Sequence, residues 1–277
     1  MMYPPGHGPA PENRTDTLPV VKLLGERSTG THLLQKVLQQ HFDMELAPSS
    51  SGVTQEQTRH LPGRLVGRWS SRRASREALQ DHNHFVELPR NGGWKHAAAS
   101  TRFLECFAIP RKAIVICLLR HPADWLRSMH RNPFHGIGHI PRDFSAFIRS
   151  PWIAAARDEL GERLIENPVK LYAAKAQSYS WLGENRDKMS LVTYENLILN
   201  PEETLRQTPV WPFRSGSKID LPNQSARPFG RRPANLDEYR RRAAAVSYDT
   251  LSDSDRDFVL SELSGSILLD LYPPSSR

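Results

Sequence analysis

A continuous apolar run, AIVICLL at residues 113–119, constrains the fold more than any other feature of this sequence. The run is far shorter than the roughly 18 residues that a membrane-spanning helix needs, and its β-branched content favours a strand. A strand without alternating polar positions is typical of a parallel sheet with helices on both faces. His121-Pro122 follows, and proline in a first helical turn predicts that a helix begins there.

A second strand and helix precede this run. The segment LPVVKLL at residues 18–24 predicts a short strand, and a glycine-containing turn follows it. The next apolar residues have helical spacing: Leu33, Leu34, Val37, Leu38 and Phe42. A third strand is expected at residues 190–193. This alternation predicts the α/β class, as a P-loop-like three-layer α/β/α domain around a central, mostly parallel sheet.

The remaining segments divide into helices and loops. We expect helices over residues 143–149, 152–166 and 168–184, another from Pro201, and a last one after Ser252. Residues from 47 to about 83 are polar and predict a loop with one short helix near residues 73–81. The proline-rich stretch 209–235 predicts a long loop. We expect residues 1–18 to be a flexible leader and residues 19–277 to form a single domain.

Charge and cysteine content narrow the function classes. The sequence has 37 basic and 30 acidic residues, a net charge of +7, which fits an anionic ligand or a nucleic acid. Its only cysteines are Cys106 and Cys117, too few for a disulfide framework. We therefore expect a soluble, cytoplasmic protein that does not insert into a membrane. A generally basic protein with solvated arginines, or one that binds nucleic acid, remains an alternative.

The turn after the first strand carries the first candidate binding site. Gly25 and Gly30 are separated by four residues, as in the loop that binds nucleoside triphosphates, but Thr31 and His32 replace its lysine and hydroxyl residue. Backbone amides at such a helix N-terminus still bind anions. The loop adds a charge and hydroxyls from Arg27, Ser28, Thr29 and Thr31. A βα turn without a ligand is the alternative.

The missing lysine and magnesium-binding hydroxyl disfavour an ordinary ATPase or kinase. We therefore expect no metal at this site, and the histidines show no zinc-binding spacing with carboxylates. A P-loop kinase or another NTP-dependent phosphotransferase remains the rival enzyme.

A second anion site is expected at the end of the apolar run. Arg120 lies where open α/β sheets bind ligands, and Ser128 follows two helical turns later. A guanidinium fork and a hydroxyl suit a terminal phosphate. Two anion sites on neighbouring connections predict a ligand with phosphates at both ends.

Three segments resemble the signature regions of sulfotransferases that use 3′-phosphoadenosine 5′-phosphosulfate (PAPS): GERSTGTHLL, LLRHPADWLRSMHRNPF and VTYENLILNPEETL. The resemblance covers about residues 20–45, 93–133 and 188–207. It implies that the first loop holds the 5′-phosphosulfate, that Arg120 and Ser128 hold the 3′-phosphate, and that Tyr194 lies near the adenine. The implied function is sulfuryl transfer from PAPS to a small-molecule or carbohydrate acceptor, at a hydroxyl.

The loop departs from the common family pattern at one position. The family's lysine, which stabilises the leaving phosphate, is replaced here by Ser28, with Arg27 beside it. The bacterial-type variant with an Arg-Ser-Thr-Gly-Thr loop also has a later Trp-Lys-His, and here residues 94–96 have that sequence. Sulfuryl transfer needs a base and a cation: His96 or His32 could be the base, and Lys95 or Arg27 the cation.

Other features of the sequence have less specific interpretations. Lys95 and His96 could instead be a solvated surface pair, and Trp94 and Trp125 fit core packing better than a site. The arginine-rich segment 64–76 could be a solvated loop, or contact an acidic acceptor or RNA. The segment 227–232, with Arg231, resembles the late basic loop that closes over the 3′-phosphate in this family.

Overall fold

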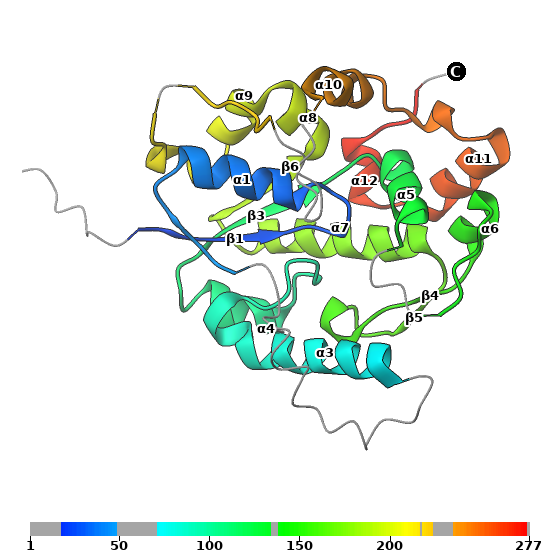
Figure 1. The fold of residues 1–277 in the computed structure, drawn as a ribbon, viewed down its shortest axis with the longest axis horizontal. Coiled ribbons are helices and arrows are strands. Elements are labelled where there is room, and N and C mark those ends of the chain that lie inside the picture. Colours follow the sequence, from blue (N-terminus) through cyan, green and yellow to red (C-terminus); the bar gives the residue numbers. More distant parts are fainter. Residues whose placement is uncertain (1–17, 49–70, 134–137, 217, 224–234, 276–277) are drawn as a thin grey trace, which may run out of the picture.

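A four-stranded parallel sheet forms the centre of the protein (Figure 1). The computed structural model describes residues 18–48, 71–133, 138–216, 218–223 and 235–275. The strands are β1 (Val20–Leu24), β2 (Glu45–Leu46), β3 (Ile114–Leu119) and β6 (Met189–Thr193), in the order β2-β1-β3-β6. All three pairings are parallel, so the predicted sheet and its three strands are confirmed.

Helices cover both faces of the sheet, which confirms the three-layer prediction. Alternate residues of β3 belong to two separate cores: Ile116 faces one and Val115 the other. The core around Ile116 includes residues of α1 (Thr31–His41), α8 (Tyr194–Leu199), α9 (Pro201–Arg206) and α10 (Leu236–Ala244). The core around Val115 includes residues of α5 (Pro122–Arg131), α6 (Phe144–Arg149), α7 (Pro168–Glu184), α11 (Asp253–Glu262) and α12 (Ile267–Leu271).

A long helix occupies part of the predicted loop between residues 47 and 83. Helix α3 (Ser71–Asn91) is far longer than the short helix expected there, so that prediction was wrong. Few of its side chains are apolar, which is why the sequence pattern understated it. Buried Arg157 bonds to Glu77 and Asp81 of this helix, and these ion pairs attach it to the rest of the protein. After α3 come α4 (Thr101–Phe103) and the π-helix η1 (Leu104–Ala108).

The predicted helix over residues 152–166 was also wrong. This segment forms an antiparallel pair of short strands, β4 (Trp152–Ile153) and β5 (Leu164–Ile165), around a 3₁₀ turn, η2 (Ala156–Asp158). Arg157 and Asp158 are fully buried in ion pairs with other elements. These contacts, which the local sequence does not reveal, determine the backbone conformation here.

The C-terminal part agrees with the expectations in outline. Helix α11 begins after its predicted cap Ser252, whereas α8, α10 and α12 were not predicted. The described part of the 209–235 stretch contains only the 3₁₀ turn η3 (Trp211–Phe213), and η4 (Tyr248–Thr250) precedes α11. Residues 1–17 of the predicted leader, residues 64–70 of the arginine-rich segment 64–76 and Arg231 lie outside the described residues, and residues 71–76 begin α3. None of the helices in the described part of the chain is both long and apolar enough to cross a membrane.

Candidate functional site

The loop from Gly25 to Gly30 joins β1 to the N-terminus of α1. Its backbone includes two residues of positive φ, Ser28 at 64° and Gly30 at 101°. Gly30 is also closely packed, because a Cβ atom there would lie 2.5 Å from the ring of Tyr194. The amide of Gly25 donates to the carbonyl oxygen of Lys95 over 2.9 Å, which ties the start of the loop to the Trp94–His96 segment.

The amides of this loop are available to an anion. Helix α1 has no side-chain cap, unlike α5, α7, α10 and α11, which all have one. Among the residues that the structure describes, no acceptor lies within hydrogen-bond reach of four backbone N–H groups, those of Ser28, Gly30, Thr31 and His32. Unpaired donors and the helix dipole together favour a bound anion at this position.

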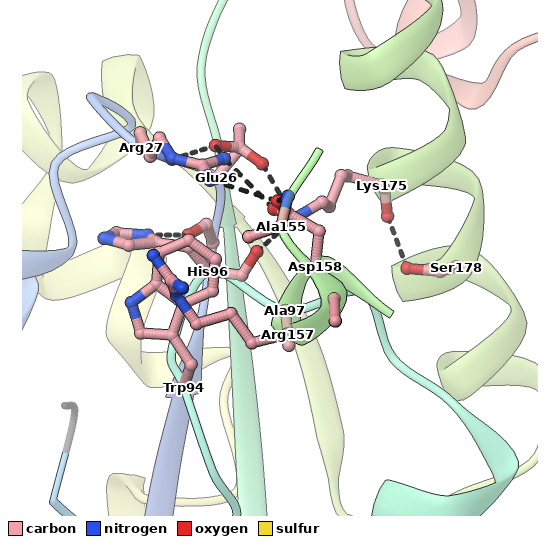
Figure 2. A network of polar contacts seen from close by, with 12 residues as sticks. Glu26, Arg27, Trp94, His96, Ala97, Ala155, Arg157, Asp158, Lys175 and Ser178 are labelled. Carbon is pink, nitrogen blue, oxygen red and sulfur yellow. Dashed lines mark hydrogen bonds and ion pairs between the residues drawn. The ribbon is translucent and has the colours of Figure 1, made fainter. Parts of the chain in front are cut away.

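The side chain of Arg27 is buried, and its guanidinium lies beside Glu26 and Asp158 (Figure 2). Its guanidinium bonds to Glu26 at 2.8 Å and to both oxygens of Asp158 at 3.1 Å. Lys175 on α7 completes the group, 2.6 Å from Asp158 and 3.0 Å from Glu26. We refer to these four residues as the buried ion network. The charge of Arg27 is compensated within it.

The network keeps Arg27 and Asp158 ionised. Burial disfavours the charged guanidinium, but the carboxylates of Asp158 and Glu26 outweigh it and raise the pKa of Arg27. Burial likewise opposes the Asp158 carboxylate, yet Arg27 and Lys175 hold its pKa below the usual range. Trp94 packs beside this charge, with the guanidinium groups of Arg27 and Arg157 4.6 and 4.5 Å from its ring centroid.

Two aromatic residues of the core around Val115 hold the loop in place. The indole N–H of Trp125 donates to the carbonyl of Arg27 over 2.7 Å, and its ring stacks on Tyr172 at 4.2 Å. The Tyr172 hydroxyl donates to the carbonyl of Arg120 and accepts from its amide. Trp94 and Trp125 are both buried, as predicted.

Lys95 and His32 meet at one end of the loop. The Lys95 ammonium lies 3.2 Å from Nε2 of His32, the second residue of α1. Burial lowers the pKa of Lys95 to about 8. Burial also lowers the pKa of His32 to about 4, with further contributions from the charges of Lys95 and Lys36. Between these values, Lys95 is a cation and His32 is neutral.

His96 lies deeper than His32. Its Nδ1 donates to the carbonyl of Gly25 over 2.6 Å, which fixes the tautomer with the proton on Nδ1. Burial, followed by the charge of Lys95, lowers the pKa of His96 well below its ordinary value. The ring therefore remains neutral, and its hydrogen bond to Gly25 stabilises the start of the loop. Lys95 and His96 are both buried, so neither is part of a solvated surface pair.

Arg120 and Tyr194 meet at the other end of the loop. Arg120 donates to the carbonyl of Ser28 over 2.9 Å, and its guanidinium lies 4.7 Å from the ring centroid of Tyr194. It also pairs with Asp124 on α5, one helical turn before Ser128 on the same helix face. Within the described structure, the buried Nε of Arg120 has no hydrogen-bond partner. The structure thus brings Ser28, Arg120 and Tyr194 together.

The other predicted residues have more local roles. Thr29 is buried, and its hydroxyl donates to the carbonyl of Glu26 over 2.7 Å, so the loop itself uses that hydroxyl. Thr31 is buried in the first turn of α1. Within the parts of the chain described, no three His, Cys, Asp or Glu side chains are grouped as a metal site would require.

Several residues that shape the site were not singled out from the sequence. They are Glu26, Asp158, Lys175, Tyr172, Asp124 and Arg242. Arg242 of α10 lies 3.6 Å from Asp124 and adds a second cation beside Arg120. Glu26 follows the loop glycine Gly25 directly, and this position in the sequence could have singled it out. The others come from distant segments whose proximity only the fold creates.

No protein-family model matches the sequence, and no curated protein matches it. Solved structures do match. A mouse sulfotransferase, SULT7A1, complexed with PAP is 12% identical, with 92% of this chain and 79% of that chain covered and a TM-score of 0.41. The sulfotransferase domain of the curacin biosynthetic pathway is 15% identical over 94% of this chain and 100% of that one, with a TM-score of 0.40.

A third structure is the sulfotransferase domain of the Synechococcus PCC 7002 olefin synthase. It is 14% identical over 91% of this chain and 96% of that chain, with a TM-score of 0.40. All three are sulfotransferases, the family that the three sequence segments resemble.

Proposed function

We propose that this protein is a sulfotransferase that moves a sulfuryl group from PAPS to the hydroxyl of a small-molecule or carbohydrate acceptor. The observation that carries the proposal is the arrangement around one loop. Unpaired amides lie at its centre, the Lys95–His32 pair at one end and Arg120 with Tyr194 at the other. A ligand with an anionic group at each end and an aromatic base matches that order of features.

The donor's 3′-phosphate is assigned to the Arg120 end. Arg120 has an unpartnered Nε and a second cation nearby in Arg242, and Ser128 can add a hydroxyl from the same face of α5. Charge-assisted bonds from a guanidinium fork are among the stronger contacts to phosphate. The Tyr194 ring, adjacent to Arg120, can contact the adenine. Arg231, which lies outside the described residues, remains a proposed additional contact.

The donor's 5′-phosphosulfate is assigned to the loop amides of Ser28 and Gly30 and to the first turn of α1. Transfer breaks the bond from sulfur to the phosphate's bridging oxygen and leaves negative charge on that phosphate. Lys95 is the cation that the geometry favours for this charge, since Arg27 is already neutralised in the buried ion network. A preorganised cation in a desolvated site stabilises such developing charge strongly.

His32 is the base that the geometry favours. Its ring is more accessible to solvent than that of His96 and is neutral near pH 7, whereas His96 is buried and its Nδ1 proton is bonded to Gly25. As the new bond from sulfur to the acceptor oxygen forms, the hydroxyl proton passes to His32. Burial, with the charge of Lys95, lowers the pKa of His32, so the imidazole is uncharged before the step and returns the proton to water afterwards.

The first test is ligand binding without metal. Thermal unfolding with 3′,5′-adenosine bisphosphate should show a rise in Tm in the presence of EDTA. ATP with Mg²⁺ should raise Tm less. If Tm rises only with ATP and only when Mg²⁺ is present, the P-loop kinase is supported. Binding of any nucleic acid with a steep salt dependence would support the nucleic-acid-binding alternative.

The second test is transfer itself. The protein is incubated with [³⁵S]PAPS and a panel of phenols, alcohols and sugars, and radiolabelled products are separated from the donor. Label should move to a hydroxyl acceptor in the presence of EDTA, and Lys95→Ala should abolish most of it. Failure of the wild-type protein to bind the bisphosphate would overturn the proposed function.

A further inference from the structure

A buried lysine at the centre of β1 is not used in the proposed reaction. Lys22 is fully buried, and its Nζ donates to three carbonyl oxygens: those of Pro48 at 2.8 Å, Asn91 at 2.7 Å and Gly93 at 2.6 Å. An ammonium group has three hydrogens, so all of its donors are used. In the described part of the chain no carboxylate pairs with Lys22.

Such a side chain is costly to bury. An ammonium without a counter-ion loses its hydration, and carbonyl dipoles replace only part of that loss. Burial and the nearby charge of Lys95 lower the pKa of Lys22 to about 7. A methionine or leucine would fill the same core space without this cost. Stability of the core therefore does not account for a lysine here.

The carbonyls that Lys22 binds suggest another role. Two of them bracket a tight turn at Gly92 and Gly93, where the φ angles are 74° and 65°. Side chains of α3 and of the turn itself accept from the amides that follow: Asn91 Oδ1 from Gly93, and His84 Nδ1 from Trp94. The backbone amides of the turn thus bond to side chains of α3, and its carbonyls bond to Lys22 of the sheet.

Lys95 is separated from this turn by Trp94 alone and is anchored on its other side near the end of the same strand. Its carbonyl accepts from Gly25, three residues after Lys22. The backbone that carries Lys95 is therefore fixed to β1 at two points, one on each side of Trp94. Without Lys22, only the contacts of Gly25 with Lys95 and His96 would join this segment to the end of the strand.

We propose that Lys22 is a positioning residue that fixes the Gly92–Gly93 turn and thereby places the Lys95 ammonium beside His32. This inference rests on the proposed function for the role of Lys95, but the mechanical link is independent of it. A displacement of about 1 Å in a catalytic group can cost about 100-fold in rate. The effect of Lys22 is therefore expected in turnover, while the distant Arg120 end retains its ligand.

The decisive variant is Lys22→Met, which keeps most of the length of the side chain and removes its donors. We expect kcat to fall by about 10–100-fold, with affinity for the bisphosphate within about twofold of wild type. Leu23→Ala, a core truncation at the next position of β1, is the matched control. At temperatures where both variants are folded, Leu23→Ala should keep its kcat.

Chemical rescue separates positioning from general damage. Lys22→Ala leaves space for the missing part of the side chain, so propylammonium should restore a measurable part of kcat by binding the three carbonyls. Tetramethylammonium at equal ionic strength has no N–H donor and should not. Rescue by both salts, or by neither, would count against the proposal.

A measurement without substrate tests the link itself. Hydrogen exchange followed by NMR should show the Gly25 amide exchanging about tenfold or more faster in Lys22→Met, while Ile116 in β3 is unchanged. Wild-type exchange at Gly25 together with wild-type kcat would overturn the inference. Faster exchange in a protein that transfers no sulfuryl group would support the link and refute the proposed function.

Discussion

The buried cations on the two sides of the Gly25–Gly30 loop are neutralised very differently. Arg27 and Lys175 share two buried carboxylates, Glu26 and Asp158, and the charges of this buried ion network balance. Lys95 and Lys22 have no carboxylate partner in the described structure and contact a histidine ring and backbone carbonyls instead. A paired cation in the interior maintains the fold. Of the two cations without a carboxylate partner, Lys95 remains available to an anion, whereas Lys22 uses its three donors on backbone carbonyls.

Arg120 is intermediate between the paired and the unpaired cations. Asp124 pairs with Arg120 and approaches Arg242, but both partners of the Arg120 pair are partly exposed, at 12% and 18% of their side-chain surface. An anionic ligand at this end competes with the Asp124 carboxylate for Arg120. The comparison therefore predicts effects on stability for the paired cations, on turnover for the unpaired ones, and on affinity for Arg120.

Removal of a network carboxylate should have the largest effect. Asp158→Asn leaves Arg27 and Lys175 with insufficient negative charge, and breaking a buried pair in this way costs about 3–5 kcal/mol of unfolding free energy. Urea denaturation at pH 7 measures it. Asp187→Asn, at an exposed carboxylate, is the control and should stay within about 0.5 kcal/mol. Similar stability of the two variants would remove the distinction between paired and unpaired cations.

Loss of the unpaired cation should affect turnover instead. Lys95→Ala should lower kcat about 10²–10³-fold, the usual effect of losing one preorganised electrostatic group. Bisphosphate affinity, measured by calorimetry, should stay close to wild type, and Lys188→Ala at an exposed lysine should change neither quantity. If Lys95→Ala keeps full turnover while Arg27→Ala loses it in a folded protein, the assignment of the cation is reversed.

Loss of Arg120 should weaken binding of the bisphosphate. Arg120→Ala removes a charge-assisted contact of about 1.5–3 kcal/mol, a loss of roughly 10–100-fold in affinity for 3′,5′-adenosine bisphosphate. At saturating donor, kcat should change little. An unchanged Kd for the bisphosphate would remove Arg120 from the site.

The unpaired lysines should also give stability a distinctive pH dependence. The pKa of Lys22 is about 7 in the folded protein and 10.5 as its ordinary value, so between these values the folded state binds fewer protons than the unfolded state. Stability then rises with pH in that window. From pH 7 to pH 9.5 the wild-type protein should gain about 2–3 kcal/mol more than Lys22→Met, because each pH unit across a shifted pKa contributes about 1.4 kcal/mol. Parallel urea curves for both proteins at the two pH values check this, and an equal gain would contradict it.

The smallest effect is expected from the competing carboxylate. Asp124→Asn removes an anion from Arg120, and a partly exposed pair of this kind is worth about 0–1 kcal/mol. Bisphosphate binding should tighten up to about fivefold in 20 mM salt, and the gain should shrink at 0.5 M salt. Weaker binding in Asp124→Asn would show instead that the carboxylate orients the guanidinium.

The sequence predicted those parts of the site that depend on local pattern. The AIVICLL run and the proline after it determine β3 and α5, and so place Arg120 at the strand end without knowledge of any distant residue. The loop glycines come from a short motif in the same way, whereas Lys95 and Tyr194 were singled out by the resemblance to sulfotransferases. The role of Arg27 could not be predicted, because its partner Asp158 is 131 residues away and lies in a segment that was predicted to be helical.

The order β2-β1-β3-β6 has a consequence for where ligands can bind. The chain leaves β1 through α1 on one face of the sheet, whereas it leaves the adjacent β3 through α5 on the other face. β1 and β3 therefore form a topological switch point, where the two connections diverge and leave room at the carboxyl ends of the strands. The separation between the Lys95 and Arg120 ends is thus a property of chain topology, and substitutions within either end can change affinity or rate without moving the site.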